Sequence, residues 1–323
     1  MAEIDRHPEY TPVSNTRPWS NSLRQISAQM RAESPVFIVG CPRSGSTLLY
    51  RILQRHSDFK PREENLSEAE VFHFANSSHL FSGSFPKPAH AYMGNDDLWQ
   101  QFMRTTAPIR TLHRVSRLPA LIRLAERSPS VWRLYGNPAF VRCYFYFARK
   151  ARGGKRILEK TNYYIRSLPR LKATFPNGHF LLIHRHPVDT YTSYLRRGRV
   201  EDRPWLRKSP SDFCRLWREN LRAAADQADE IKAIAYHELT SEPEHVFRDV
   251  CAHIASPFEA ESLREPNPDM NRLPVDPHLY APITAKTKNW RDFMSEADAM
   301  TIEAELRDVM THWGYKPYVA AAE

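Results

Sequence analysis

Residues 36–47 read VFIVGCPRSGST, and this stretch decides how the rest of the chain is arranged. Its first four residues are β-branched or aromatic, which predicts a buried strand. Gly40 and Gly45 bracket a short loop, and residues 46–53 predict a helix that begins directly after it. A loop that leads into a helix offers backbone N–H groups and the positive end of the helix dipole to an anion. The stretch therefore predicts an anion-binding loop.

The loop has the spacing of the phosphate-binding motif G-x-x-x-x-G-K-[ST], except that Ser46 stands where the motif has lysine. In nucleoside triphosphatases this lysine contacts the phosphates, and a strand-end aspartate helps to hold Mg²⁺. The next strong strand pattern, residues 180–184, is followed by Arg185 and not by aspartate. The loop is therefore expected to hold a group that is transferred without a metal, with these polar side chains available: Arg43, Ser44, Ser46 and Thr47. A purely structural turn bracketed by two glycines is the alternative.

A second polar motif surrounds the end of that strand. Arg185 follows the strand, Pro187 suits the first position of a helix over 187–197, and Ser193 lies on the second turn of this helix. Arginine presents a planar fork that suits phosphate, so Arg185 and Ser193 are expected to converge on one anion. A surface ion pair beside an ordinary helix serine explains the same residues equally well.

The composition favours a protein that handles anions. The 323 residues carry a net charge of +9, which an anionic ligand explains without nucleic acid. The four cysteines are scattered without a C-x-x-C pair, so neither a disulfide framework nor a zinc site is expected. The sequence has no apolar signal-peptide core and no run of about 18 apolar residues, so we expect no membrane span and a cytoplasmic location.

Strand and helix patterns alternate along the chain, which predicts an α/β fold: a three-layer, P-loop-like arrangement with a central parallel sheet. Ligands bind such sheets at the carboxyl ends of the strands. We expect an N-terminal arm or tail over 1–34, a single domain over 35–323, and a helical insertion at about 76–152. The expected strands are 36–39, 156–160, 180–184 and 233–236, and the expected helices are 46–53, 164–175, 187–197, 211–232, 243–254 and 295–312.

The two motifs together resemble those of sulfotransferases that use 3′-phosphoadenosine 5′-phosphosulfate (PAPS). Residues 41–49, CPRSGSTLL, resemble the 5′-phosphosulfate loop of this family, and Arg185 with Ser193 resembles its 3′-phosphate motif. Arg43, where the cytosolic small-molecule enzymes carry lysine, is similar to the carbohydrate, tyrosylprotein and bacterial branches. The resemblance runs over about residues 35–312 and includes three shorter segments, at 158–161, 236–243 and 288–291.

The resemblance implies transfer of a sulfuryl group from PAPS to an acceptor hydroxyl by in-line displacement, without a metal and with PAP as the product. It implies that Arg43 and Lys160 neutralise charge that develops on the bridging oxygen. The residues implied in donor binding are Arg43, Ser44, Gly45, Ser46, Thr47, Arg185, Ser193, Tyr236 and Lys288. The acceptor is left open among carbohydrate, lipid-linked, phenolic and peptide hydroxyls, and the oligomeric state is left open as well.

The acceptor hydroxyl needs a group that takes its proton. Glu63 and Glu64 match the place of a glutamate pair in tyrosylprotein sulfotransferases, which implies that Glu64 is the general base. The arginine that follows the pair in those enzymes is absent, because Asn65 stands there, and this weakens the case for a peptide-tyrosine acceptor. Glu63, His73 and His184 are the alternative bases.

Two other classes of protein fit parts of the sequence. A metal-dependent P-loop kinase or nucleotidase fits the loop spacing, although Ser46 and the missing strand-end aspartate disfavour it. A non-catalytic binding protein for polyanions fits the basic insertion and leaves Glu63 and Glu64 without a role. Dependence on magnesium and ATP would identify the former, and polyanion binding with a steep salt dependence would identify the latter.

Overall fold

The computed structural model describes residues 28–59, 142, 145, 146, 149, 154–200, 208–264, 283 and 289–319. Four strands in this part of the chain form one sheet: β1 (Val36–Gly40), β2 (Leu158–Lys160), β3 (His179–His184) and β4 (Ile231–Ala235). They lie in the order β2-β1-β3-β4, and every pair is parallel. The predicted α/β fold with a central parallel sheet is therefore confirmed.

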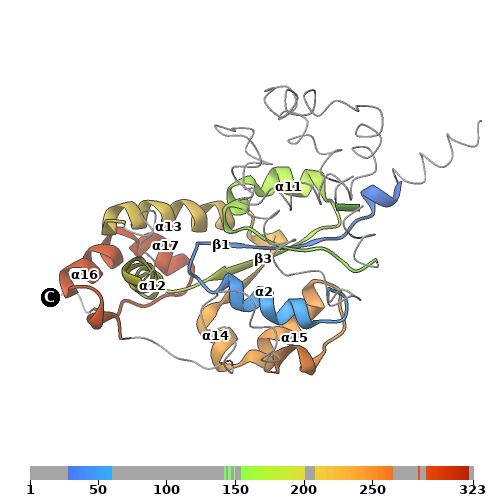
Figure 1. Cartoon of the computed structure of the whole chain (residues 1–323). Coiled ribbons are helices and arrows are strands. Elements are labelled where there is room, and N and C mark those ends of the chain that lie inside the picture. Colours follow the sequence, from blue (N-terminus) through green and yellow to red (C-terminus); the bar gives the residue numbers. More distant parts are fainter. Residues whose placement is uncertain are drawn as a thin grey trace, which may run out of the picture.

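Helices cover both faces of this sheet (Figure 1). One face carries α11 (Leu168–Thr174), α13 (Pro210–Ala225) and α17 (Arg307–His312), with α12 (Pro187–Val200) and α16 (Glu296–Glu305) beside them. The other face carries α2 (Ser46–Arg55), α14 (Tyr236–Ser241) and α15 (Pro243–His253). The result is a three-layer arrangement with the sheet in the middle.

The alternation of side chains along β1 builds a separate apolar core on each face. Phe37 and Val39 join the core that includes Trp217 of α13, whereas Val36 and Ile38 join the core under α2 and α15. All four β1 side chains are fully buried. Burial on both faces explains why this strand reads as a continuous apolar run rather than as an alternating pattern.

The chain leaves α13 earlier than the sequence pattern predicts. Ala225 is the last residue of the helix, η3 (Ala228–Glu230) follows, and β4 begins at Ile231. The predicted end of the 211–232 helix is therefore wrong. This segment contains no glycine or proline that would mark the end of a helix, but the residues from Ile231 onward pair with β3 and become a strand. Tyr236, expected to end the strand, is instead the first residue of α14.

Two other predicted helices are divided in the structure. The segment at 295–312 forms α16 and α17, separated at the fully buried Leu306, whose φ of −105° and ψ of 8° depart from helical geometry. The segment at 164–175 begins as a 3₁₀ helix, η1 (Asn162–Ser167), before α11. Pro169 consequently lies in the first turn of α11, where its missing N–H breaks no helical hydrogen bond.

Parts of the expected arm and of the insertion contact each other. Arg149 Nε lies 2.8 Å from Oε1 of the buried Glu33, and the Phe145 ring packs into the core beside α11. Most of 1–34 and of 76–152 lies outside the described residues, so the proposed division of the chain remains a prediction.

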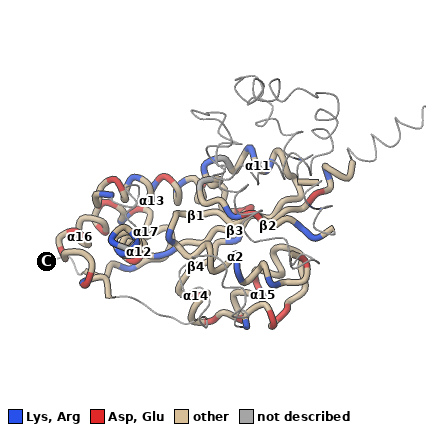
Figure 2. The backbone as a smooth tube through the Cα atoms, viewed as in Figure 1, with Lys and Arg blue, Asp and Glu red and all other residues tan. Residues whose placement is uncertain are grey.

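The outer surfaces of the described helices mix both signs of charge (Figure 2). Arg222 of α13 pairs with Asp308 of α17 over 2.6 Å, and Arg248 pairs with Glu244 within α15 over 2.7 Å. These pairs are solvent-exposed, so each contributes little to stability. Within the described ranges, no helix combines the length and apolar character needed to cross a bilayer.

Candidate functional site

Two glycines give the loop between β1 and α2 its shape. Gly40 and Gly45 have φ values of 149° and 106°, in the region that favours glycine. A Cβ on Gly40 would lie 2.3 Å from the Ile183 carbonyl oxygen, and one on Gly45 would lie 2.3 Å from Cδ2 of Tyr236. A side chain at either position would push the loop away from β3 or α14, so steric hindrance explains why both positions carry glycine.

Ser44 ties the loop to the sheet. Its buried hydroxyl lies 2.7 Å from the Cys41 carbonyl oxygen and 2.9 Å from that of Ile183, while its backbone N–H donates to Cys41. The side chain therefore serves the loop conformation from inside the protein. Arg43, directly before it, has a φ of 72°, and a left-handed conformation costs a non-glycine residue about 1–3 kcal/mol.

The first turn of α2 has backbone N–H groups that its own side chains do not cap. Gly45 is the N-cap residue, no side chain accepts a hydrogen bond there, and the first turn contains no acidic residue. The first N–H groups of a helix lack an intrahelical carbonyl partner. The N–H groups at Ser46 and Thr47 and the helix dipole therefore favour an anion at the loop.

Arg43 and Lys160 join the loop to neighbouring elements. Arg43 Nε donates to Ser193 Oγ of α12 over 3.2 Å, and Lys160 Nζ, at the end of β2, donates to Thr47 Oγ1 over 3.1 Å. These contacts bring together residues that lie 150 and 113 positions apart in the sequence. The structure thus places the loop, Lys160 and Ser193 at one site, as expected from the strand ends of a parallel sheet.

Lys160 lies in a cationic environment. Its side chain is almost fully buried, and burial together with the charges of Arg43 and Arg51 lowers the pKa of its ammonium group to about 7. Burial raises the pKa of the neighbouring Glu159 carboxyl, despite a hydrogen bond from Thr161 Oγ1 over 3.2 Å. A nearby anion favours the protonated lysine, so Lys160 gains charge when an anion arrives.

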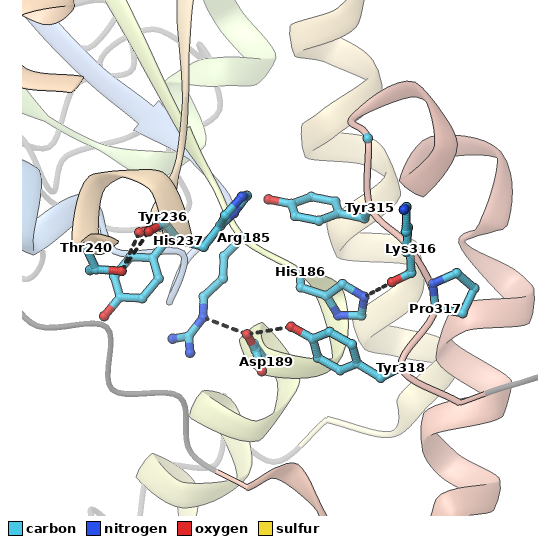
Figure 3. Close-up of a pocket in the computed structure, with 11 residues that line it drawn as sticks. Arg185, His186, Asp189, Tyr236, His237, Thr240, Tyr315, Lys316, Pro317 and Tyr318 are labelled. Carbon is cyan, nitrogen blue, oxygen red and sulfur yellow. Dashed lines mark hydrogen bonds and ion pairs between the residues drawn. The ribbon is translucent and has the colours of Figure 1, made fainter. Parts of the chain in front are cut away.

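Arg185 packs against Tyr236, and the Tyr236 ring lies beside Gly45 of the loop. The guanidinium carbon of Arg185 lies 4.4 Å from the centroid of the Tyr236 ring, which is the ring that Gly45 approaches. Its Nε faces Oδ2 of Asp189 at 3.5 Å (Figure 3). A cation–π contact and an ion pair therefore fix this guanidinium. The residues predicted from both motifs gather at the carboxyl ends of the strands.

A pocket of about 360 Å³ opens beside Arg185 (Figure 3). Three segments line it: the start of α12, the helix α14, and residues 314–318 after α17. The last segment was missed by sequence reasoning, because it lies beyond the stretch covered by the motif resemblance. The sequence does contain one signal that could have pointed to this segment: two aromatic residues, Tyr315 and Tyr318, follow the final helix.

His184 and His186 both lie against the ring of Tyr315, with ring centroids 5.5 and 5.4 Å away. His184 Nδ1 is 2.6 Å from the Tyr315 hydroxyl, and His186 Nε2 is 3.0 Å from the Lys316 carbonyl oxygen. Burial lowers the pKa of each imidazole to about 4, so both are neutral at pH 7. Over the ranges that the structure describes, no group of three or more His, Cys, Asp or Glu residues is arranged to hold a metal ion.

Some of the predicted functional residues lie outside the residues that the structure describes: Glu63, Glu64, His73 and Lys288. Their roles therefore stay predictions. Trp290, close to Lys288 in the sequence, is 6% exposed and packs in the same core as Met294. This packing explains Trp290 as a core residue.

The fold and the site define a class of protein. A strand–loop–helix anion cradle at the carboxyl edge of a parallel sheet, bordered by arginine and lysine side chains, is typical of P-loop-like α/β proteins that bind phosphorylated ligands. Residues 35–260 match the model of the family described as "Sulfotransferase family". The chain belongs to the sulfotransferase family, as its motifs predicted, and this assignment does not favour the metal-dependent P-loop kinase or nucleotidase.

Solved sulfotransferase domains share the fold. The sulfotransferase domain from the Synechococcus PCC 7002 olefin synthase matches with a TM-score of 0.53 and 19% identity, over 88% of this chain and 96% of that chain. The sulfotransferase domain from the curacin biosynthetic pathway matches with a TM-score of 0.52 and 17% identity, over 88% and 99% respectively. At these identities the likeness concerns the fold alone. No curated sequence matches the chain significantly.

Proposed function

We propose that the protein moves the sulfuryl group of PAPS to an acceptor hydroxyl. The observation that carries this proposal is the convergence of two anion-binding elements, joined by the hydrogen bond from Arg43 to Ser193. One is the loop at the start of α2, and the other is formed by Arg185, which follows β3, and Ser193 of α12. A nucleotide with charged groups on both its 5′ and its 3′ positions suits this pair, and family membership supports the sulfuryl chemistry.

The loop is proposed to hold the 5′-phosphosulfate. Backbone N–H groups of Gly45, Ser46 and Thr47 bind its oxygens, while Ser44 keeps the loop in shape. Arg43 and Lys160 neutralise the charge that develops on the bridging oxygen. The pKa of about 7 is compatible with this role, because a bound anion favours the protonated form of Lys160 and so places a cation beside the anion.

The 3′-phosphate is proposed to lie at Arg185 and Ser193. Arginine binds phosphate through its planar fork, and the Tyr236 ring supports that fork from one face. Lys288 completes the nucleotide site in this proposal. Within it, PAPS is a co-substrate that leaves as PAP and no metal takes part.

In the transfer step, the acceptor oxygen forms a bond to sulfur while the bond between sulfur and the bridging oxygen breaks. The acceptor proton passes to a base, for which we propose the Glu64 carboxylate, with Glu63 and His73 as alternatives. His184 is the weaker candidate, because its imidazole has a pKa of about 4 and bonds to the Tyr315 hydroxyl.

Thermal unfolding with added nucleotides tests the donor site. Ligands that bind the folded state raise the Tm, so PAP should raise it more than AMP, which lacks the 3′-phosphate, and more than ATP with Mg²⁺. Equal shifts for PAP and AMP would remove the case for 3′-phosphate recognition. Magnesium-dependent turnover of ATP would instead support the alternative function, a metal-dependent P-loop kinase or nucleotidase. Mass spectrometry after incubation with PAPS and carbohydrate, lipid-linked, phenolic or peptide acceptors then identifies the acceptor class.

A further inference from the structure

The segment after α17 folds back onto the start of α12 (Figure 3). Its backbone is held by Glu303 of α16, whose carboxylate accepts from the N–H groups of Tyr318 over 2.6 Å and Val319 over 3.2 Å. The Tyr318 ring stacks on the His186 imidazole with a centroid distance of 3.8 Å and an interplanar angle of 11°. Glu303 is 6% exposed and His186 is 4% exposed. Two buried partners therefore hold the segment against the site, while Tyr318 itself is 44% exposed.

Tyr318 contacts the arginine motif through one carboxylate oxygen. Its hydroxyl donates to Asp189 Oδ2 over 3.1 Å, and the same oxygen faces Arg185 Nε at 3.5 Å. The Arg185 and Asp189 side chains are 14% and 10% exposed, so water screens this contact only weakly. The Tyr236 ring lies against the guanidinium 4.4 Å from its carbon. The Asp189 carboxylate thus forms an ion pair on the Nε side of the guanidinium, where Nε makes no hydrogen bond to the described residues, while an aromatic ring supports the face of the guanidinium.

The terminal nitrogens of Arg185 point away from Asp189 (Figure 3). These two nitrogens form the edge of the fork that suits a phosphate group. We propose that Tyr318 is a positioning residue that holds the Asp189 carboxylate, which in turn orients the Arg185 fork toward the 3′-phosphate. This inference rests on the proposed function. It assigns to the C-terminal segment a part in distinguishing PAP from nucleotides without a 3′-phosphate.

The test compares PAP with AMP on the full chain by isothermal titration calorimetry. Tyr318→Phe removes the hydroxyl and keeps the ring that stacks on His186. It should weaken PAP binding by about three- to tenfold and leave AMP within about twofold, because AMP has no group for Arg185 to hold. Asp189→Asn should show the same selective loss. Tyr146→Phe is the matched control: it removes a hydroxyl that donates to Gln29 Oε1 over 2.7 Å, outside the pocket beside Arg185, and should leave both affinities unchanged.

The outcomes separate this inference from the proposed function. If the wild-type chain does not prefer PAP to AMP, the proposed 3′-phosphate site is wrong, and the role of Tyr318 falls with it. If the wild type prefers PAP and both variants keep the same preference, only the positioning role is overturned. Tighter PAP binding by Asp189→Asn would overturn it too, since the carboxylate would then compete with the phosphate for Arg185. A Tm within a few degrees of the wild type shows that a selective loss is not caused by unfolding.

Discussion

Raising the pH from 7 to 9 should weaken PAP binding about 50-fold, because Lys160 loses its proton. Burial and the charges of Arg43 and Arg51 lower the pKa of this ammonium group to about 7. The protonated fraction of the free protein therefore falls from about one half at pH 7 to about 1% at pH 9. A bound anion restores the proton, so the loss of affinity amounts to about 2.3 kcal/mol.

The sign of this effect follows from the direction of the pKa shift. Above pH 7 the free protein binds fewer protons at Lys160 than the complex does, so binding takes up a proton and weakens as the pH rises. Three other buried groups of the site stay uncharged in this range. Burial raises the pKa of the Cys41 thiol to about 12 and lowers those of His184 and His186 to about 4, so none of the three changes charge between pH 7 and 9.

Calorimetric titration of PAP at pH 7, 8 and 9, in two buffers with different ionisation enthalpies, measures both the affinity and the protons exchanged. The wild type should take up about 0.9 proton at pH 8. Lys160→Arg keeps a permanent cation and should remove the pH dependence, whereas Lys160→Met should bind weakly at every pH. A wild-type affinity that is constant from pH 7 to 9, or a slope that persists in Lys160→Arg, would refute the reasoning.

Three further substitutions test separate parts of the site. Arg185→Ala should weaken PAP about 10- to 100-fold in a titration while AMP binding changes little, and an unchanged PAP affinity would exclude the arginine from the 3′-phosphate site. Glu64→Gln should abolish sulfuryl transfer in a PAP-release assay with PAP affinity nearly intact; transfer that survives within a few fold means that another group is the base. Gly45→Ala should lower the free energy of unfolding by about 1–3 kcal/mol, because its Cβ meets the Tyr236 ring at a positive φ. If denaturant titration gives this variant the same free energy of unfolding as the wild type, the loop can shift to make room for the added methyl group.

The part of the site nearest to the first strand could be predicted from the sequence because its signals are local. Four apolar residues, two glycines and a helix start fix β1, the loop and α2 within the stretch at 36–47. The contact between the loop and Ser193 could also be anticipated, since parallel strands end at the same edge of a sheet. The sequence did not indicate which group of the loop would contact Ser193; in the structure it is the Arg43 side chain.

The missed features depend on contacts between distant segments. Tyr318 meets Asp189 across 129 positions, and its segment has neither helical nor strand periodicity to mark it. The start of β4 was missed for a related reason, because only pairing with β3 turns Ile231 from helical to extended backbone. Patterns within a window of residues cannot report such pairing.

The hydrogen bonds of Ser44 have a consequence for how the loop meets a ligand. Its hydroxyl and the two glycines set the backbone from inside the protein, so the loop has lost its conformational entropy before any ligand arrives. A preorganised cradle gives up little further freedom on binding, and more of the contact energy appears as affinity. It also has little capacity to reshape itself. A nucleotide whose anionic groups are spaced differently would have to adapt to the protein, and the rigid loop would select ligands by spacing as much as by charge.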